Sequence, residues 1–416
     1  MNSFFQLHRS IKIRLYLQFS THLVTMTIIP YLAIYFSHLV GTTITGILVI
    51  CVICSGLLGG LVGGHLADQI GRKKLLVLSE FGLGISYLAI AFVNSSWVVL
   101  PYVSFVFFLI NMFCNGMYIP VSTAMIHDLV KKNERKFVFT AIYWLSNLAT
   151  AFGTIIGAFI FQDYHFYLFI IVAITSIISS AITYLFIGET FTKKDVNRVS
   201  TSTTSIWSSY RRVLHDRTYV IFLIATLLVL SLESHLTNYI AVYLKESVKE
   251  SSLFGHFTVD GVNMVGILHA ENTLVIVFTV GMITRLVRNM SDQLRLIVGM
   301  LLYVVGYSFL SYVTAPIWLI GIMLFISIGE LMYIPIRQSL LADLADKNYR
   351  SSYLALNSFI GQGTMIIAGA AITIGGKVPA YVMSGGFFLL GLIGVLLMVN
   401  VMNLRTREDS REKMID

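Results

Sequence analysis

The amino-acid sequence predicts an all-α polytopic membrane protein with twelve transmembrane helices, arranged as two parallel-repeat bundles of six. Three observations support this prediction: an apolar composition, a series of bilayer-length apolar runs and an internal repeat. The chain has 416 residues, of which 56% are hydrophobic and 12% are charged, and its mean hydropathy is +0.80. Soluble proteins are about 45–50% apolar and about 25% charged. The apolar excess is therefore too large for one water-soluble core.

Apolar runs long enough to cross a bilayer follow one another along most of the chain, since a spanning helix needs about 20 apolar residues. The twelve candidate spans are 13–37, 43–66, 75–94, 97–125, 137–161, 165–187, 218–243, 269–287, 296–314, 316–342, 352–375 and 379–402.

A polar, Ser/Thr-rich segment at 188–217 separates the first six runs from the last six. We therefore expect an N-terminal six-helix bundle at 1–187 and a cytoplasmic linker at 188–217. A C-terminal six-helix bundle at 218–402 and a cytoplasmic tail at 403–416 complete the predicted organisation.

The distribution of Lys and Arg predicts the orientation, because cytoplasmic loops of membrane proteins are enriched in these residues. If both termini are cytoplasmic, all 29 Lys and Arg residues except Lys245, Lys249 and Lys377 lie on the cytoplasmic side. We expect a multi-pass protein of a bacterial cytoplasmic membrane with this orientation. The net charge of +8 follows from the same bias. No basic folded domain is indicated, so no nucleic-acid partner is expected.

An internal repeat supports the division into halves. The tetrapeptide Met-Tyr-Ile-Pro occurs at 117–120 and again at 332–335, and an Asp follows each copy at the same distance, at Asp128 and Asp343. The copies lie in the fourth and tenth predicted helices, so helix n corresponds to helix n+6 with the same direction across the membrane. Parallel repeats of this kind suit transporters whose halves alternate around a site between them. The copies differ in charge, because Asn115 corresponds to Glu330.

Motifs for other energy sources and for enzymatic chemistry are missing from the sequence. It contains no GxxxxGK[ST] for nucleotide binding and no GxSxG or HExxH. The three cysteines lie in apolar runs and predict neither disulfides nor a metal site. We therefore expect no enzyme activity, no cofactor and no metal, with a proton gradient as the energy source.

Ionisable residues inside the predicted spans are the first candidates for function, because each costs about 2.5–3.5 kcal/mol on insertion scales. Glu330 lies about halfway along the tenth helix, with no basic residue within a turn before it and Arg337 about two turns away, and we expect it to carry a proton. Glu233 lies in the middle of the seventh helix, where it could bind a cationic substrate or share protons. His235 could titrate near neutral pH. The alternatives are a neutral, hydrogen-bonded structural acid and a histidine that only packs.

Charged residues at helix ends are predicted to have simpler roles. Arg14 begins the first helix, where snorkelling to the cytoplasmic interface is the simplest expectation. Glu80 begins the third helix and is expected at the interface. Asp128 and Asp343 end their helices near basic loops, where we expect each to pair with Arg or Lys in a gate or latch.

Aromatic residues form 13% of the chain and accompany 16 Met. Such surfaces suit variable lipophilic ligands, and some of the aromatic side chains belong at membrane lipids. Five residues could line a central cavity, with core or lipid-facing packing as the alternative for each: Tyr118, Tyr143, Trp144, Tyr239 and Tyr333.

The loop after the second predicted helix reads GGHLADQIGRKKLL at 63–76. It resembles the signature loop of the major facilitator superfamily, G-x-L-A-D-x-x-G-R-K-x-x-L, and the resemblance implies the major facilitator fold. In that family the loop latches the two halves together. The latch candidates here are Gly64, Asp68, Gly71, Arg72 and Lys73. An ordinary solvated turn is the alternative.

The second helix also carries Gly56, Gly60 and Gly64 at four-residue spacing. Small residues at this spacing allow close helix packing. We expect this face to form a sliding contact between the two bundles.

A closer resemblance, to the drug:proton antiporters of the superfamily and their lactococcal multidrug group in particular, runs over nearly the whole chain. It includes TGIL at 45–48, YW at 143–144, GETF at 188–191 and GELMYIP at 329–335. The resemblance implies that lipophilic, often cationic drugs are exported in exchange for protons.

The functional residues of this group match Arg14, Asp68, Asp128 and Glu330. Two positions depart from its pattern, because Ile142 and Thr237 stand where the group has acids. Glu233 precedes Thr237 by four residues, which is one turn on the same face of a continuous helix. We therefore expect Glu233 to replace that acid, with Thr237 beside it.

The sequence thus predicts a monomeric, proton-coupled exporter whose partners are lipophilic small molecules, protons and membrane lipids. An uptake symporter, or an exporter of one endogenous solute or lipid, would have the same fold. A polytopic enzyme or receptor without transport is the more remote alternative.

Overall fold

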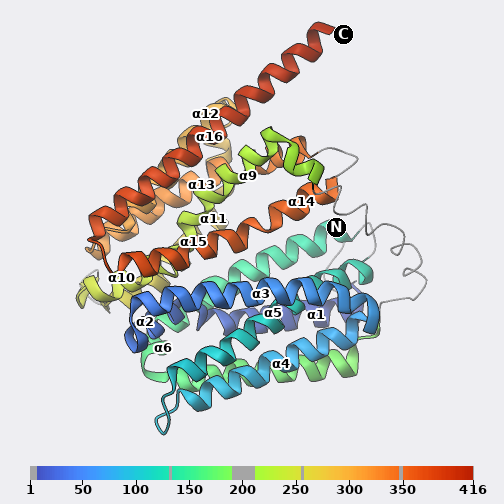
Figure 1. The fold of residues 1–416 in the computed structure, drawn as a ribbon, viewed down its shortest axis with the longest axis vertical. Helices are drawn as coiled ribbons and strands as arrows, with labels where there is room; N and C mark the ends of the chain where they lie inside the picture. The colour runs from blue at the N-terminus through green and yellow to red at the C-terminus, as the bar shows by residue number, and fades with distance from the viewer. Residues whose placement is uncertain (1–6, 131–133, 190–210, 254–256, 346–349, 416) are drawn as a thin grey trace. The chain divides into compact units, whose positions relative to one another are not determined.

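The computed structural model describes residues 7–130, 134–189, 211–253, 257–345 and 350–415, with some side chains inside these ranges left out. The chain forms two compact units. Unit 1 consists of Met1–Val199 and Val262–Ala270, and unit 2 of Ser200–Gly261 and Glu271–Asp416. Each unit is an all-helical bundle apart from short strands (Figure 1).

The helices of unit 1 follow one another with short connections. They are α1 (Arg9–Met26), the 3₁₀ turn η2 (Ile29–Tyr31), α2 (Leu32–Val40), α3 (Thr42–Ile70), α4 (Arg72–Val93), α5 (Pro101–Leu129) and α6 (Arg135–Phe186). Within the bundle α5 packs against both α3 and α4, and α6 packs against both α1 and α4 (Figure 1).

Helix α6 accounts for two predicted spans. Its 52 residues run through a single non-helical residue, Tyr164, with φ −125° and ψ 22°. This kink lies between the predicted spans 137–161 and 165–187. Within the described residues, eleven helical segments are long and apolar enough to cross a membrane, and one of them is this kinked pair. The predicted all-α fold with twelve spans is therefore confirmed.

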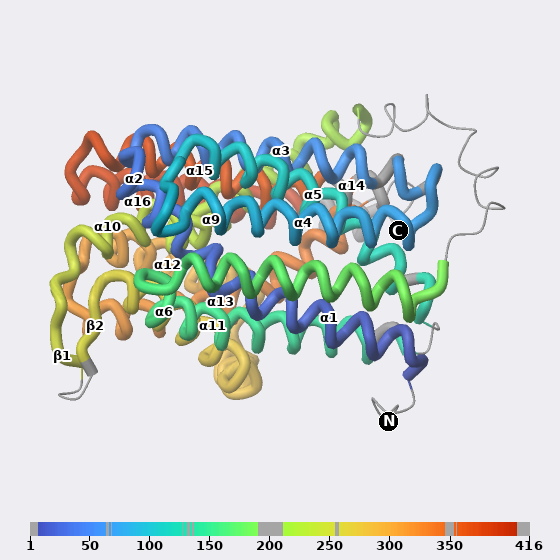
Figure 2. The backbone as a smooth tube through the Cα atoms, turned by 90° about the horizontal axis from the view of Figure 1, so that it is seen from below, coloured from blue at the N-terminus to red at the C-terminus, as the bar shows by residue number. Residues whose placement is uncertain are grey.

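Unit 2 contains most of the remaining elements. They are α9 (Arg217–Ser234), α10 (Tyr239–Ser247), β1 (Ser251–Leu253), β2 (Phe257–Val259), α11 (Gly261–Leu286), α12 (Asp292–Leu310), α13 (Pro316–Leu344), α14 (Arg350–Ser358), α15 (Ile360–Gly375) and α16 (Ala380–Ile415). Helix α12 packs against α13 and α16, and α9 packs against α15 and α16. The strands pair antiparallel, with Ser251 opposite Val259, and follow α10 in the chain (Figure 2).

The first span of each half is interrupted. Helix α1 ends at Met26 before Pro30, whose ring removes a backbone donor, and the chain resumes as α2. Helix α9 ends at Ser234, and residues 235–238 form a turn before α10. The prediction of a continuous seventh helix was wrong. Glu233 is the penultimate residue of α9, and Thr237 lies in the turn, so the one-turn spacing between them does not apply.

The glycines of α3 pack inside unit 1. A Cβ atom added at Gly59 or Gly63 would collide with the backbone of α5. One added at Gly56 would lie 3.4 Å from the backbone oxygen of Met112, which is also on α5. Of the predicted face Gly56, Gly60 and Gly64, the two described glycines Gly56 and Gly60 lie against α5 of the same unit. Close approach of two helix backbones explains why small residues occur here.

Candidate functional site

Glu330 is held in unit 2 by a polar group from a second helix. Its Oε2 atom accepts a hydrogen bond from Nδ2 of Asn272 at 3.1 Å, which joins α13 to α11. The same amide nitrogen donates to Oγ of Ser327 at 3.1 Å. Ser327 lies nearly one turn before Glu330 on α13 and is fully buried. Asn272 therefore orients the carboxyl group of Glu330 from across the helix interface.

Glu233 meets a cluster of buried tyrosines. Its Oε2 atom accepts a hydrogen bond from the hydroxyl of Tyr303 on α12 at 3.3 Å. The ring centroid of Tyr303 lies 4.8 Å from that of Tyr307 and 5.2 Å from that of Tyr333. Tyr333 is three residues after Glu330 on α13. The tyrosine cluster, defined as Tyr303, Tyr307 and Tyr333, thus connects the two acidic positions.

The two carboxyl groups form one electrostatic site that has no ion-paired Lys or Arg among the described residues. The charge of Glu233 acts on Glu330. Among the described residues, neither forms an ion pair with Lys or Arg. Arg337, two turns after Glu330, is half-buried and forms no ion pair among the described residues, but its charge acts on Glu233. The tyrosines are buried, whereas Glu330 is half-buried and Glu233 is exposed. Both acids are therefore accessible to small ligands from the surface of unit 2.

The other predicted residues of unit 2 are not brought to these carboxyl groups. His235 is fully buried, its ring stacks on Phe387 with centroids 4.1 Å apart, and neither ring nitrogen has a hydrogen-bond partner. Tyr239 packs against the same Phe387 and is 5% exposed. Tyr239 is therefore a packed side chain that α16 covers. Tyr333 likewise lies in a packed cluster and is 1% exposed.

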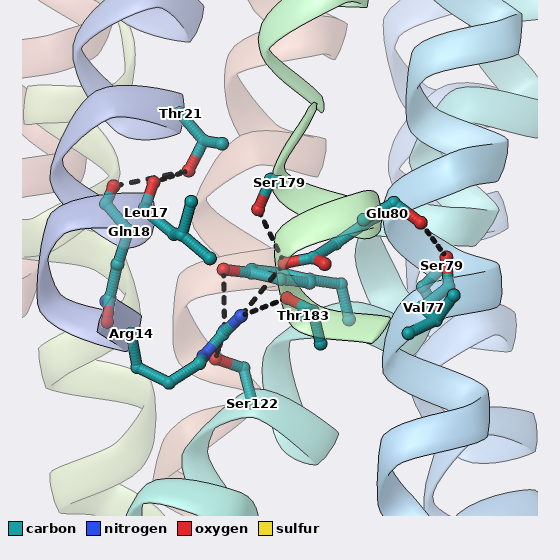
Figure 3. Close-up of polar contacts among 12 residues, drawn as sticks. Arg14, Leu17, Gln18, Thr21, Val77, Ser79, Glu80, Ser122, Ser179 and Thr183 are labelled. Atoms are coloured by element: carbon teal, nitrogen blue, oxygen red, sulfur yellow. Dashed lines mark hydrogen bonds and ion pairs between the residues drawn. The ribbon is translucent and has the colours of Figure 1, made fainter. Parts of the chain in front are cut away.

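Arg14 and Glu80 form a buried ion pair in unit 1, which overturns two expectations. Nη1 of Arg14 lies 2.9 Å from Oε1 of Glu80, and their side chains are 0% and 3% exposed. Arg14 does not snorkel and Glu80 is not interfacial. The guanidinium also donates to the hydroxyls of Ser122 at 2.7 Å and Tyr118 at 3.2 Å. Figure 3 shows this cluster, to which α1, α4, α5 and α6 contribute.

A cavity of about 300 Å³ adjoins this ion pair in unit 1. Tyr118 and Glu80 line it together with residues of α1, α5 and α6. The cavity-lining prediction for Tyr118 thus matches its position. Tyr143 and Trp144 do not line it, and both are exposed on the surface of unit 1.

The signature loop forms a capped helix start. Gly71 has φ 96°, a conformation that glycine adopts without strain. The backbone N–H of Arg72 donates to Oε1 of Glu189 at 3.1 Å, and that of Lys73 donates to Oε2 at 3.2 Å. A carboxylate at the start of α4 complements the helix dipole. The side chain of Arg72 pairs with Asp128, so the loop is tied to the ends of both α6 and α5.

Two further latch candidates, Lys73 and Asp343, also contact other helices. Lys73 places its ammonium nitrogen 5.3 Å from the ring centroid of Tyr184. Asp343 pairs with Arg405 of α16 at 2.7 Å. For Gly64 and Asp68 the structure describes only the backbone, as part of α3.

Several polar residues of these clusters carried no signal in the sequence. Asn272, Tyr303 and Glu189 are common residue types, and only the packing of distant segments brings them to their partners. Glu271 on α11 was also missed; its Oε2 atom is buried without a hydrogen-bond partner. An acid inside an apolar run was a usable signal for Glu271, as it was for Glu330. Among the described residues, no group of three His, Cys, Asp or Glu is placed to hold a metal ion.

Comparison with known proteins identifies the family. The model of the Major Facilitator Superfamily matches residues 15–369. A Na(+), Li(+), K(+)/H(+) antiporter of Planococcus maritimus is 30% identical over 365 residues, which cover 84% of this chain and 86% of the relative. The multidrug resistance protein MdtH of Photorhabdus laumondii is 22% identical over 354 residues, covering 81% and 79%.

A solved structure shares the fold. A POT family transporter in complex with 5-aminolevulinic acid matches with a TM-score of 0.72 and 16% identity, over 97% of this chain and 98% of that chain. These relatives and structural neighbours are transporters and not enzymes. The chain is a multi-pass membrane protein and a secondary transporter that belongs to the major facilitator superfamily.

Proposed function

We propose that the protein is a proton-coupled antiporter that exports lipophilic cations, with Glu330 and Glu233 as the groups that bind protons and substrate in turn. The observation that carries the proposal is the acidic pair of unit 2. The charges of the two carboxyl groups act on each other, and no Lys or Arg among the described residues forms an ion pair with either, although the charge of Arg337 acts on Glu233. Acids in membrane spans are costly and mark ion or substrate pathways.

Competition between protons and cationic substrate follows from this charge. Two carboxylates whose charges act on each other repel one another, so the site is stabilised when it takes up positive charge. A proton on either acid, or a cation beside both, supplies it. Each ligand therefore weakens the binding of the other, which is the requirement for exchange across a membrane.

The neighbouring groups position the acids in this proposal. Asn272 donates to Glu330 and Tyr303 donates to Glu233. Neither donor carries charge, so both orient a carboxyl group without neutralising it. The tyrosine rings beside them are buried and pack on one another. The acids of this site therefore favour a cation as cargo.

Exchange of alkali cations for protons is the second candidate function. A relative that is 30% identical is named as a Na(+), Li(+), K(+)/H(+) antiporter. Carboxylate, amide and hydroxyl oxygens are suitable ligands for such ions, and Glu330, Asn272 and Ser327 lie together. An uptake symporter, or an exporter of one endogenous solute or lipid, remains a further outcome that the experiment distinguishes.

The loop contacts suggest how the transport cycle is gated. We propose that the pairs Arg72–Asp128 and Arg405–Asp343 act as latches on the cytoplasmic side of a bacterial cytoplasmic membrane, with both termini on that side. Both pairs are partly exposed. Their contribution to stability is therefore small, on the order of 1 kcal/mol or less, which allows such pairs to open and close.

Inside-out vesicles test the proposal directly. Energised vesicles that contain wild-type protein should accumulate ethidium, and dissipating the pH gradient should stop accumulation. Glu330→Gln should abolish ethidium transport driven by the gradient while the protein still inserts into the membrane. Gln338→Leu, an exposed position on the same helix, serves as the control. Parallel vesicles with Na⁺, Li⁺ or K⁺ distinguish alkali-cation exchange from drug export. Unchanged transport in Glu330→Gln would contradict the assignment.

A further inference from the structure

Arg337 brings a positive charge to the acidic pair of unit 2. Its charge acts on Glu233, yet among the described residues the two side chains form no ion pair. The arginine side chain is half-buried, and its Nε atom is buried without a hydrogen-bond acceptor. A buried donor without an acceptor is destabilising. The guanidinium therefore gains stability from any movement that brings it to an acceptor such as the Glu233 carboxylate.

The internal repeat identifies the position in unit 1 that corresponds to Arg337. Helices α5 and α13 each have 29 residues, begin with a proline and contain a second proline at the same place. With these helices aligned, Tyr118 corresponds to Tyr333 and Ser122 corresponds to Arg337. The two bundles therefore share the tyrosine and differ in the residue one turn after it.

Unit 1 places a guanidinium at this same level of its bundle. Arg14 donates to the hydroxyls of Tyr118 and Ser122 and pairs with Glu80 at 2.9 Å (Figure 3). In unit 2 the residue that corresponds to Ser122 is itself the arginine. Both bundles thus combine a guanidinium, the repeated tyrosine and an acid from another helix. Among the described residues, only the guanidinium of unit 1 is paired with its acid.

The path from Arg337 to Glu233 crosses two tyrosines. Arg337 follows Tyr333 by four residues, which is one turn on the same helix face. The ring of Tyr333 lies 5.2 Å from that of Tyr303, whose hydroxyl donates to Glu233 at 3.3 Å. Pro335 precedes Arg337 inside α13 and removes a backbone hydrogen bond, and helices bend at such positions. Arg337 can therefore approach Glu233 or withdraw from it without loss of the helix.

A guanidinium and a bound cation exclude each other at one carboxylate, because like charges placed side by side repel. We propose that Arg337 is a specificity-determining residue whose guanidinium competes with the transported cation for Glu233. The competition weakens cation binding, so that the cargo is released on the far side of the membrane. This inference rests on the proposed function, because it requires a cationic cargo at the acidic pair.

Binding of radiolabelled tetraphenylphosphonium, a lipophilic cation, tests the competition. Equilibrium dialysis with the purified full-length protein in lipid nanodiscs measures binding, and nanodiscs without protein measure partitioning into lipid. Arg337→Gln should tighten binding about tenfold, because the competing charge is removed. Loss of a merely structural side chain would weaken binding or leave it unchanged, so the direction of the effect is diagnostic.

Two further substitutions separate the charge of Arg337 from other effects. Arg337→Lys keeps the charge and should retain most of the wild-type behaviour. Arg288→Gln removes an exposed arginine from the turn after α11 and should leave the affinity unchanged. Thermal unfolding of each variant checks that it is folded.

A Glu233→Gln background identifies the carboxylate for which Arg337 competes. In that background Arg337→Gln should tighten binding much less than in the wild type, because the shared acid is absent. Equal tightening in both backgrounds would show that Arg337 acts through the general charge of the bundle, which would overturn the inference.

The outcomes separate this inference from the proposed function. Saturable binding in the wild type with unchanged or weaker binding in Arg337→Gln would overturn the role of Arg337 and leave the proposed export of cations standing. A wild type that binds no tetraphenylphosphonium saturably would overturn both. Loss of proton-driven ethidium transport in Glu330→Gln tests the proposed function without reference to Arg337.

Discussion

Arg14 of α1 and Glu80 of α4 form an ion pair across 2.9 Å, although 66 residues separate them in the chain. Neither side chain reaches solvent beyond a few per cent of its surface. Removing one member of a buried pair leaves a charge without a partner, which costs about 3–5 kcal/mol. Replacing both members with neutral groups of similar size is much less costly.

We therefore expect Arg14→Met to destabilise the protein strongly, because Glu80 would then be buried without its cation. The double substitution Arg14→Met/Glu80→Gln should recover most of the lost stability. Thermal unfolding of the purified variants in detergent measures both effects. A double variant that unfolds at a lower temperature than the single one would show that the pair is not the source of the loss.

The hydrogen bond from Tyr303 to Glu233 predicts a functional coupling. Tyr303→Phe keeps the ring in the tyrosine cluster and removes only the donor. Ethidium transport should fall about three- to tenfold, because a hydrogen bond to a charged group is lost. In a Glu233→Gln background the same substitution should cause a much smaller additional loss. Tyr243→Phe, whose hydroxyl donates to the backbone oxygen of Tyr312, is the control. Additive losses in the double variant would contradict the coupling.

Alanine substitutions at Gly71 and Gly41 give a matched comparison that tests the packing of the signature loop. Both have positive φ, 96° and 82°, so alanine at either position is strained by about 1–3 kcal/mol. A Cβ atom at Gly71 would also collide with the carboxylate of Glu189, whereas nothing lies near Gly41. Gly71→Ala should therefore reduce stability more than Gly41→Ala. The additional substitution Glu189→Ala should remove part of that difference. Equal melting temperatures for the two alanine variants would rule out the steric contribution.

Gly59 and Gly60 are adjacent on α3 but differ in their surroundings. A Cβ atom at Gly59 would overlap the backbone of Phe113, whereas at Gly60 the nearest atom is 3.6 Å away. Gly59→Ala should destabilise by about 1–3 kcal/mol through overpacking. Gly60→Ala should be neutral or stabilising, since alanine favours helix by up to about 1 kcal/mol. Thermal unfolding measures both, and a tolerated Gly59→Ala would mean that α3 and α5 can separate.

Hydropathy predicted the spans well because a bilayer imposes a minimum length on each apolar helix. It placed the break between the fifth and sixth spans correctly, although the structure makes that break a kink at Tyr164 rather than a loop. It did not reveal the turn at 235–238, although three of its four residues are polar, because the apolar residues on either side keep the whole segment long and apolar enough to span. A local interruption of helical geometry leaves the length of an apolar run unchanged.

The candidate site was predictable only in part, for a related reason. Glu330 and Glu233 were recognisable because a charge inside an apolar run is costly wherever the run packs. Their partners Asn272 and Tyr303 are neutral and lie on other helices. Neither has the high insertion free energy that makes a charged residue stand out in an apolar run. Arg14 was recognisable as a charge but its environment was not, because Glu80 reaches it only through the packing of α1, α4 and α6. The position of Arg14 and Glu80 at the starts of their helices predicted that both lie at the membrane interface. The packing of the helices instead buries the ion pair inside the bundle.

The two bundles balance their internal charges in different ways, and this difference has an electrical consequence. Unit 1 pairs Arg14 with Glu80, whereas Glu233 and Glu330 of unit 2 form no ion pair with Lys or Arg among the described residues. If both acids exchange their protons for one monovalent cation, each turnover carries net positive charge inward. Export would then be electrogenic, and the transmembrane voltage would drive it together with the pH difference. Collapsing the voltage alone with valinomycin and K⁺ should therefore slow ethidium transport, and an unchanged rate would indicate electroneutral exchange.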